Sequence, residues 1–196
     1  AMAHDKNVVH RDLKPENVML IESPDDPYFV KLMDFGLAHL LPEDEAHSEE
    51  TRLTAAGVVY GTPAYLSPEQ ALAETIDARS DIYGLGAMMF EMLTGQLPYQ
   101  GANVVQVLKA HVVAEVPSAR ERIPEKDILP ELDAIIQKMM AKDPAERYAS
   151  ATEVIDALDA LTNPQRSGNT RQLVSTAAIA DDIAAGISAS SASLPA

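Results

Sequence analysis

Two short stretches carry side chains whose types and spacing could do chemistry. The first, residues 10–17, offers a carboxylate at Asp12, an ammonium group at Lys14 and an amide at Asn17. The second, Asp34-Phe35-Gly36, adds a carboxylate fixed beside a glycine. Two oxygen ligands held side by side suit Mg²⁺, which takes few protein oxygens together with substrate phosphates. The two stretches therefore favour a magnesium site.

A β-hairpin is predicted between these stretches. Residues 18–21 and 29–33 are β-rich, and the turn-forming sequence at residues 23–27 separates them. Because a hairpin returns the chain on itself, we expect Asn17 and Asp34 to be neighbours at its open end.

Downstream, apolar residues recur at helical spacing in several segments. The strongest predicted helix has Asp77 as its N-cap and ends at Gly95. Further helices are predicted over residues 103–113, from Pro130 onward, and from Ser150 to the stop at Asn163-Pro164, whereas residues 117–130 are predicted to be irregular. The apolar positions of the first helix are Ile82, Leu85, Met89, Met92 and Leu93.

The stretch around Asp12 resembles the catalytic loop of eukaryotic-type protein kinases, and the triplet at Asp34 resembles their metal-binding triplet. The resemblance implies that Asp12 accepts or orients the proton of the substrate hydroxyl, and that Lys14 binds ATP and neutralises charge on the transferred phosphate. It also implies that Asn17 and Asp34 hold Mg²⁺, with Mn²⁺ as an alternative. The Lys at position 14 is the choice typical of serine/threonine kinases.

The resemblance implies structural roles for further residues around the site. His10 and Phe35 would pack the loop and the triplet together, and Gly36 completes the triplet. Asp81, inside the predicted helix 77–95, would hold the backbone of the catalytic loop. It would be a scaffold residue and not a reactant.

Residues 61–69 resemble the end of a kinase activation segment. Ser67 stands where the family more often has Ala; bacterial members often show this form, which points to a bacterial source. Thr62 would hydrogen-bond toward the catalytic carboxylate and lysine and shape the hydroxyl pocket. Glu69 would form a buried ion pair with Arg147.

The polar segment 38–60 resembles the activation segment itself. Arg11 would receive a phosphate placed on this segment, because phosphate adds negative charge and pairs bidentately with Arg. Thr51 and Thr54 are the first candidate phosphorylation sites, and Ser48 is the third. For each of them the simpler interpretation is a solvated loop hydroxyl.

Composition narrows the classes of partner. The net charge of −15 argues against a nucleic-acid partner, which would require a basic surface. The absence of Cys excludes disulfides and thiolate metal sites. No run of about 18 apolar residues predicts a transmembrane segment in this chain, and no signal peptide is visible. A cytoplasmic location is expected, and a membrane anchor in the full-length protein is left open.

Together the motifs predict a mainly α (α+β) fold, the helical bundle of a kinase C-terminal lobe with a short β-hairpin carrying the catalytic loop and metal triplet. This lobe is predicted over residues 1–162 and a flexible Ser/Ala-rich tail over residues 163–196. No glycine-rich loop, strand lysine or partner glutamate precedes the catalytic loop in the 196 residues. We therefore expect a fragment whose N-terminal nucleotide-binding lobe is missing and which is inactive alone.

Three functions are compatible with these motifs. The first is a serine/threonine protein kinase that transfers the γ-phosphoryl group of ATP to hydroxyls of protein substrates. The alternative is a non-catalytic, kinase-like binding module. A metal-dependent hydrolase using Asp12 and Asp34 ranks last, because it leaves Lys14, Thr62 and the predicted ion pair without a purpose.

Overall fold

The structure, a computed structural model, describes residues 1–22, 28–35 and 63–162. These residues belong to one compact unit, Ala1–Pro164. Several predicted features lie outside the described residues, namely Gly36, Thr62, the candidate phosphorylation sites Ser48, Thr51 and Thr54, and the segment 163–196.

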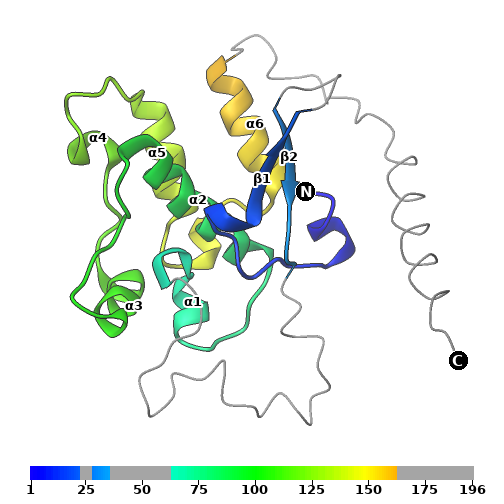
Figure 1. The fold of residues 1–196 in the computed structure, drawn as a ribbon, viewed down its shortest axis with the longest axis horizontal. Helices are drawn as coiled ribbons and strands as arrows, with labels where there is room; N and C mark the ends of the chain where they lie inside the picture. Colours follow the sequence, from blue (N-terminus) through cyan, green and yellow to red (C-terminus); the bar gives the residue numbers. More distant parts are fainter. Residues whose placement is uncertain (23–27, 36–62, 163–196) are drawn as a thin grey trace, which may run out of the picture. The chain divides into compact units, whose positions relative to one another are not determined.

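Helices dominate the described chain and a single two-stranded sheet accompanies them (Figure 1). The α-helices are α1 (Pro68–Ala71), α2 (Ala78–Thr94), α3 (Val104–Val113), α4 (Ala119–Arg122), α5 (Pro130–Met139) and α6 (Ala151–Thr162). The strands are β1 (Val18–Ile21) and β2 (Phe29–Leu32), and short 3-10 helices cover His4–Lys6, Pro15–Asn17, Pro63–Tyr65 and Pro144–Glu146. The predicted mainly α fold with one hairpin is confirmed.

The hairpin has the geometry that the sequence predicts at its open end. β1 and β2 pair antiparallel, with Val18 opposite Leu32. The Met33 N–H donates to the Asn17 carbonyl at 2.9 Å, which extends the pairing one residue beyond the strands. Residues 17 and 33 are therefore opposite each other, and Asp34 follows directly.

Helix α2 runs through the core with the predicted caps at both ends. The Arg79 N–H donates to Asp77 Oδ1 at 2.8 Å, and Gly95 ends the helix with a φ of 70°, a conformation that glycine adopts without strain. The prediction that Met92 lies on the apolar face of this helix is wrong, because its side chain is 77% exposed and points away from the core. The largest fully buried side chains of α2 are Tyr83 and Phe90.

Helix α5 packs so closely on α2 that the crossing requires a glycine. A Cβ on Gly86 would lie 2.8 Å from Met139 Cβ and 2.9 Å from Met140 Cγ. We expect Gly86→Ala to lower the free energy of unfolding by about 1–3 kcal/mol, since overpacking outweighs the better helix propensity of Ala. Gly84→Ala is the matched control, because its Cβ would lie 3.4 Å from Leu13 Cβ. Urea unfolding of both variants measures the difference, and equal effects would contradict the packing argument.

His111 of α3 is buried among polar and aromatic groups from other segments. Its Nδ1 lies 2.9 Å from the Tyr83 hydroxyl, and its ring meets the Tyr99 ring edge-on at 4.8 Å. The Lys142 ammonium donates to the His111 carbonyl at 2.7 Å. Burial, together with the charge of Lys142, lowers the pKa of His111 to about 4, so the folded protein keeps this imidazole neutral.

Acid is therefore expected to weaken the fold through His111. Between its usual pKa near 6.5 and the folded value of about 4, the unfolded chain binds the proton and the folded chain does not. The free energy of unfolding should fall across that window by about 3 kcal/mol. His111→Gln keeps an acceptor for Tyr83 but cannot titrate, so its stability should change less with pH. Urea unfolding at several pH values tests this, and an unchanged pH dependence in the variant would contradict it.

Candidate active site

The loop that carries Asp12 is fastened to α2 through Asp81. The backbone N–H groups of His10 and Arg11 donate to the two oxygens of the Asp81 carboxylate, each at 2.8 Å. Asp81 is only 4% exposed, and these bonds compensate the burial of its polar oxygens. Its side chain also lies 2.8 Å from His4 Nε2, a contact that the sequence analysis did not predict.

His10 joins the loop to the segment after β2. Its ring Nε2 lies 2.8 Å from the Met33 carbonyl oxygen, and its ring packs on Phe35 with centroids 4.7 Å apart. His10 is 2% exposed, so this contact forms part of the interior. The catalytic-loop stretch and the Asp34 triplet are thereby held next to each other.

The three reactive groups of the first stretch converge on one carboxylate oxygen. Asp12 Oδ2 lies 2.7 Å from Lys14 Nζ and accepts a hydrogen bond from Asn17 Nδ2 at 3.1 Å. The same Asn17 amide donates to the Asp12 carbonyl at 2.8 Å. Asp12 is therefore fixed through its side chain and its backbone.

Asn17 and Asp34, the two residues expected to bind a metal ion, both lie at the open end of the hairpin. Because Asn17 turns its amide nitrogen toward Asp12, its side-chain oxygen is directed elsewhere. Asp34 is exposed and has a φ of 54°, which is uncommon for a residue with a side chain. Within residues 1–22, 28–35 and 63–162, no group of three or more His, Asp and Glu side chains could hold a metal. One amide oxygen and one carboxylate match the small number of protein ligands that Mg²⁺ accepts.

Glu69 of α1 and Arg147, which follows the 3-10 helix Pro144–Glu146, form a buried bidentate ion pair. Arg147 Nη1 and Nη2 donate to the two oxygens of Glu69 at 2.7 and 2.8 Å, and the Ser80 hydroxyl donates to Glu69 at 2.6 Å. Burial alone would raise the pKa of Glu69, but the hydrogen bonds from Arg147 and Ser80 outweigh it and keep the pKa below its usual value. The carboxylate is therefore charged in the folded protein.

Two further contacts near the loop were missed by sequence reasoning. Gln70 Nε2 donates to the Arg11 carbonyl at 2.6 Å, and the Tyr65 hydroxyl donates to Glu91 at 2.6 Å. Burial and Glu91 raise the pKa of Tyr65 well above its usual value, so this hydroxyl remains a donor. The spacing of Ser67 and Gln70 is a capping-box signature and could have drawn attention to Gln70.

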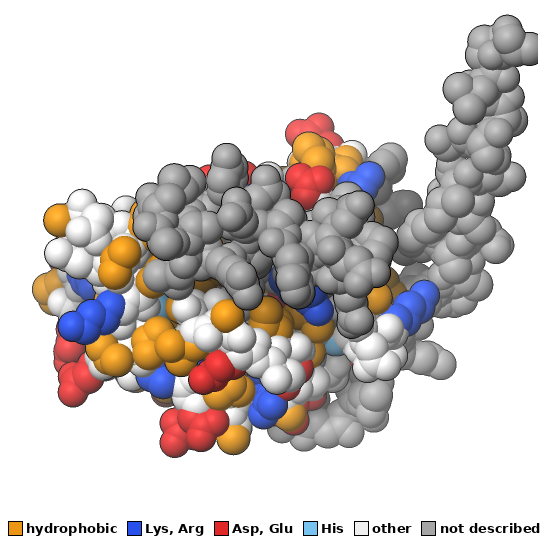
Figure 2. Space-filling view, turned by 90° about the horizontal axis from the view of Figure 1, so that it is seen from below, with side chains coloured by type: hydrophobic (Ala, Val, Ile, Leu, Met, Phe, Trp, Pro, Cys, Tyr) orange, Lys and Arg blue, Asp and Glu red, His pale blue; other side chains and the backbone are white. Residues whose placement is uncertain are grey.

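The surface gives less information about partners than the loop does. In the view of Figure 2, the Lys and Arg side chains of the described residues are scattered among acidic and hydrophobic ones. None of the helices in the described part of the chain is long and apolar enough to cross a membrane.

Comparison of the sequence with known proteins relates the chain to one family. Residues 1–158 match the family described as protein kinase domain. The chain is 38% identical over 164 residues to the serine/threonine-protein kinase pkn3 of Myxococcus xanthus, covering 84% of this chain and 29% of that protein. It is 43% identical over 153 residues to the serine/threonine-protein kinase PknB of Mycolicibacterium smegmatis, covering 78% of this chain and 23% of that protein.

A third relative is a probable serine/threonine-protein kinase of Streptomyces coelicolor, 40% identical over 176 residues, which cover 90% of this chain and 24% of that protein. The chain thus spans less than a third of the length of the curated relatives it matches. The match over residues 1–158 includes the Asp12 loop, the Asp34 triplet and the buried Glu69–Arg147 pair. This chain belongs to the protein kinase family.

Proposed function

We propose that the protein is a serine/threonine protein kinase that transfers the γ-phosphoryl group of ATP to Ser and Thr hydroxyls of protein substrates. The observation that carries the proposal is the fixed Asp12 carboxylate, with Lys14 and Asn17 both on its Oδ2. Because ATP is the phosphoryl donor, we assign the proposed activity to the cytoplasm.

Asp12 would receive the proton of the attacking hydroxyl. With Oδ2 engaged, Oδ1 is the oxygen left to face a substrate, since none of the described residues hydrogen-bonds to it. The positive charge of Lys14 lies within 2.7 Å of the same carboxylate, where it can also neutralise charge on the phosphoryl group in flight. Phosphoryl transfer requires little covalent chemistry from the protein, so orientation and charge are what these residues contribute.

Asn17 and Asp34 would hold the metal ion. The Asn17 amide nitrogen is committed to Asp12, which leaves the side-chain oxygen for a cation. Mg²⁺, or Mn²⁺ in its place, would supply neutralisation of the ATP phosphate charge when bound. The two protein ligands would also fix the position of the nucleotide relative to Asp12.

Removal of divalent metal is expected to abolish transfer, and added Mg²⁺ or Mn²⁺ should restore it. Asp34→Asn should raise the Mg²⁺ concentration for half-maximal activity by at least about tenfold, because a charged ligand is lost. Asp127→Asn is the control, since Asp127 is an exposed residue outside the site. Initial rates measured across a Mg²⁺ titration would decide, and identical curves for the two variants would remove Asp34 from the metal site.

The function itself is tested with the complete gene product, radiolabelled ATP and a generic protein substrate. We expect label on Ser and Thr after acid hydrolysis and phosphoamino-acid analysis. ATP binding without transfer would favour the non-catalytic binding module. Release of free phosphate without labelled protein would favour the metal-dependent hydrolase.

A further inference from the structure

Gln70 makes contacts with two different parts of the site. Its side-chain oxygen accepts hydrogen bonds from the Ser67 N–H at 3.0 Å and from the Ser67 hydroxyl at 3.1 Å. Its amide nitrogen donates to the Arg11 carbonyl at 2.6 Å. The side-chain oxygen thus helps to cap the N-terminus of α1. The side-chain nitrogen reaches Arg11, the loop residue next to Asp12.

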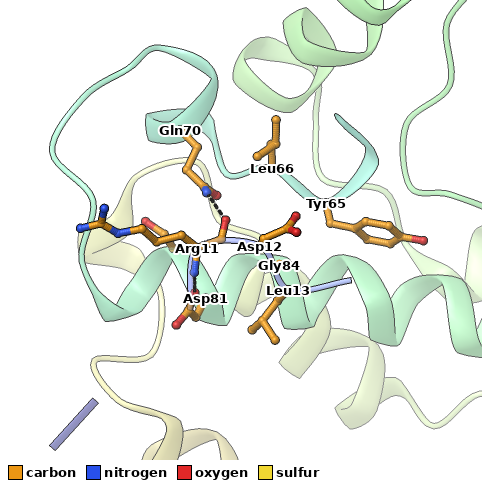
Figure 3. A pocket seen from close by; sticks show the side chains of 9 residues that line it. Arg11, Asp12, Leu13, Tyr65, Leu66, Gln70, Asp81 and Gly84 are labelled. Carbon is orange, nitrogen blue, oxygen red and sulfur yellow. Dashed lines mark hydrogen bonds between the residues drawn. The ribbon is translucent and has the colours of Figure 1, made fainter. Parts of the chain in front are cut away.

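Arg11 is the residue in this loop that most needs such support. Its φ of 68° lies in the left-handed region, which costs free energy for a residue with a Cβ and persists only when the surroundings hold it. Asp81 of α2 accepts the Arg11 N–H, and Gln70 of α1 donates to the Arg11 carbonyl. Figure 3 shows the two contacts on opposite sides of the loop, with the Arg11 side chain and the Asp12 carboxylate pointing in opposite directions.

We propose that Gln70 is a positioning residue for phosphoryl transfer, acting through the Arg11–Asp12 peptide. The inference rests on the proposed kinase function and extends it to a residue outside the catalytic-loop and metal stretches. The carbonyl that Gln70 holds belongs to the peptide bond that leads into Asp12. Rotation of this peptide would redirect the Asp12 side chain, and the Gln70 donor opposes that rotation.

The proposal gives Gln70 a role that Asp81 cannot fill alone. Asp81 accepts N–H groups and fixes the start of the strained turn. It offers nothing to the Arg11 carbonyl, because a carboxylate has no proton to donate when charged. Among the described residues, Gln70 is the side chain that hydrogen-bonds to this carbonyl. Order at the end of the activation segment is thereby linked to the orientation of Asp12.

Gln70→Glu separates the donor function from the capping function. A carboxylate retains an acceptor for Ser67, which is the residue pattern of the usual capping box, but it cannot donate to the Arg11 carbonyl. We expect kcat to fall about tenfold with little change in KM for ATP, because small misplacement of a reacting group costs rate and not ground-state binding. The Tm should stay within about 3 °C of the parent value.

Gln106→Glu is the matched control. Gln106 occupies the same position in α3, three residues after the N-cap Asn103, and its side-chain oxygen accepts the Ala102 N–H at 2.9 Å. The substitution adds the same charge at an equivalent helix position away from Asp12. Its kcat should remain at the parent value. A fall in kcat equal to that of Gln70→Glu would overturn the proposal.

The pH dependence of activity separates positioning from a purely structural role, because a purely structural role would not change it. Once protonated, the introduced carboxyl group can donate to the Arg11 carbonyl, so the activity deficit of Gln70→Glu relative to the parent should shrink as pH falls. Gln70→Lys is the reciprocal variant, which keeps a donor and loses the acceptor, and it should retain more kcat than Gln70→Glu despite a lower Tm. If Gln70→Glu does not fold, Gln70→Lys is compared with the parent: a kcat within about twofold of the parent value supports the proposal, and a fall of about tenfold or more overturns it.

Besides an equal fall in kcat in Gln106→Glu, three results would overturn the proposal: unchanged kcat in Gln70→Glu, a deficit that is constant with pH, or a kcat in Gln70→Lys as low as in Gln70→Glu. Each leaves the proposed kinase function intact as long as the parent protein phosphorylates its substrate. Loss of that parent activity would instead refute the proposed function itself, so the two failures are distinguishable.

Discussion

Asp12→Asn is expected to lower kcat for protein phosphorylation by about 10²–10⁴-fold, the range of a positioned proton acceptor. The amide oxygen can still accept from Lys14 and Asn17, so the geometry around the side chain is largely kept. What is lost is the negative charge that would take up the hydroxyl proton in the proposed reaction. The effect should therefore appear in kcat, with KM for ATP changed little.

Initial rates of phosphate incorporation by the complete protein measure this loss. Asp156→Asn is the matched control, because Asp156 is exposed on α6 and should leave the rate unchanged. Comparable Tm values for the two variants would show that the fold is intact. The expected loss is at least about a hundredfold. A rate for Asp12→Asn within about twofold of the parent rate would therefore remove Asp12 from its assigned role.

The elements that were predicted well have signals that are local in sequence. Helix α2 has an N-cap at Asp77, a terminal Gly95 and apolar residues at helical spacing, and each of these acts within a turn or two of the chain. The hairpin follows from two β-rich stretches around a turn. Where propensity, pattern and caps agree, tertiary packing has no conflict to resolve.

The features that were predicted wrongly depend on sequence signals that are weaker or not local. Residues 117–130 are predicted to be irregular, but they contain α4. Its N-cap is Ser118, whose hydroxyl accepts the Glu121 N–H, and this signal stands inside a charged, Pro-bounded segment. Met92 lies at helical spacing near the apolar stripe, yet it falls on the exposed side because periodicity alone does not set which edge of a stripe is covered. In the Ser150 cap, Glu153 accepts from the Ala149 N–H, one residue before the expected partner.

The candidate site also contains contacts that the local sequence predicts and contacts that it does not. Asp12, Lys14 and Asn17 lie within one short loop, so their proximity follows from the sequence. The Gln70 contact with Arg11 joins residues 59 positions apart, and no periodicity reports such a pairing. The φ of 68° at Arg11 is equally invisible in sequence, because Arg has no preference for that conformation.

Arg147→Ala is expected to destabilise the protein by about 3–5 kcal/mol, the largest stability effect that the described ion pairs support. The Arg147 side chain is 0% exposed, and its guanidinium donates to Glu69 and to the carbonyls of Arg79, Ala141 and Lys142. All five N–H donors of the group are engaged. Truncation would leave the Glu69 carboxylate buried without its cation and would also create a cavity.

Arg79→Ala is the control that separates burial from the mere presence of an ion pair. Arg79 lies 2.6 Å from Asp77, as close as the buried pair, but the two side chains are 35% and 49% exposed. Solvent screening limits such a pair to about 1 kcal/mol or less. Urea unfolding of the two Arg→Ala variants compares the effects directly, and similar losses would show that burial does not decide the strength of these pairs.

The same pair gives a pH signature whose sign follows from the lowered pKa of Glu69. Above the usual carboxyl pKa, near 4.5, the stabilisation is fully present; as pH falls toward the lower folded pKa, the unfolded chain takes up a proton first and stability is lost. Glu69→Gln removes that titration, so its free energy of unfolding should depend less on pH below about 4.5 than that of the parent. Because His111 titrates over a neighbouring range, the comparison is best made in the His111→Gln background, where a remaining acid slope that Glu69→Gln abolishes belongs to the ion pair. An acid slope that survives both substitutions would assign the pH dependence to other carboxylates.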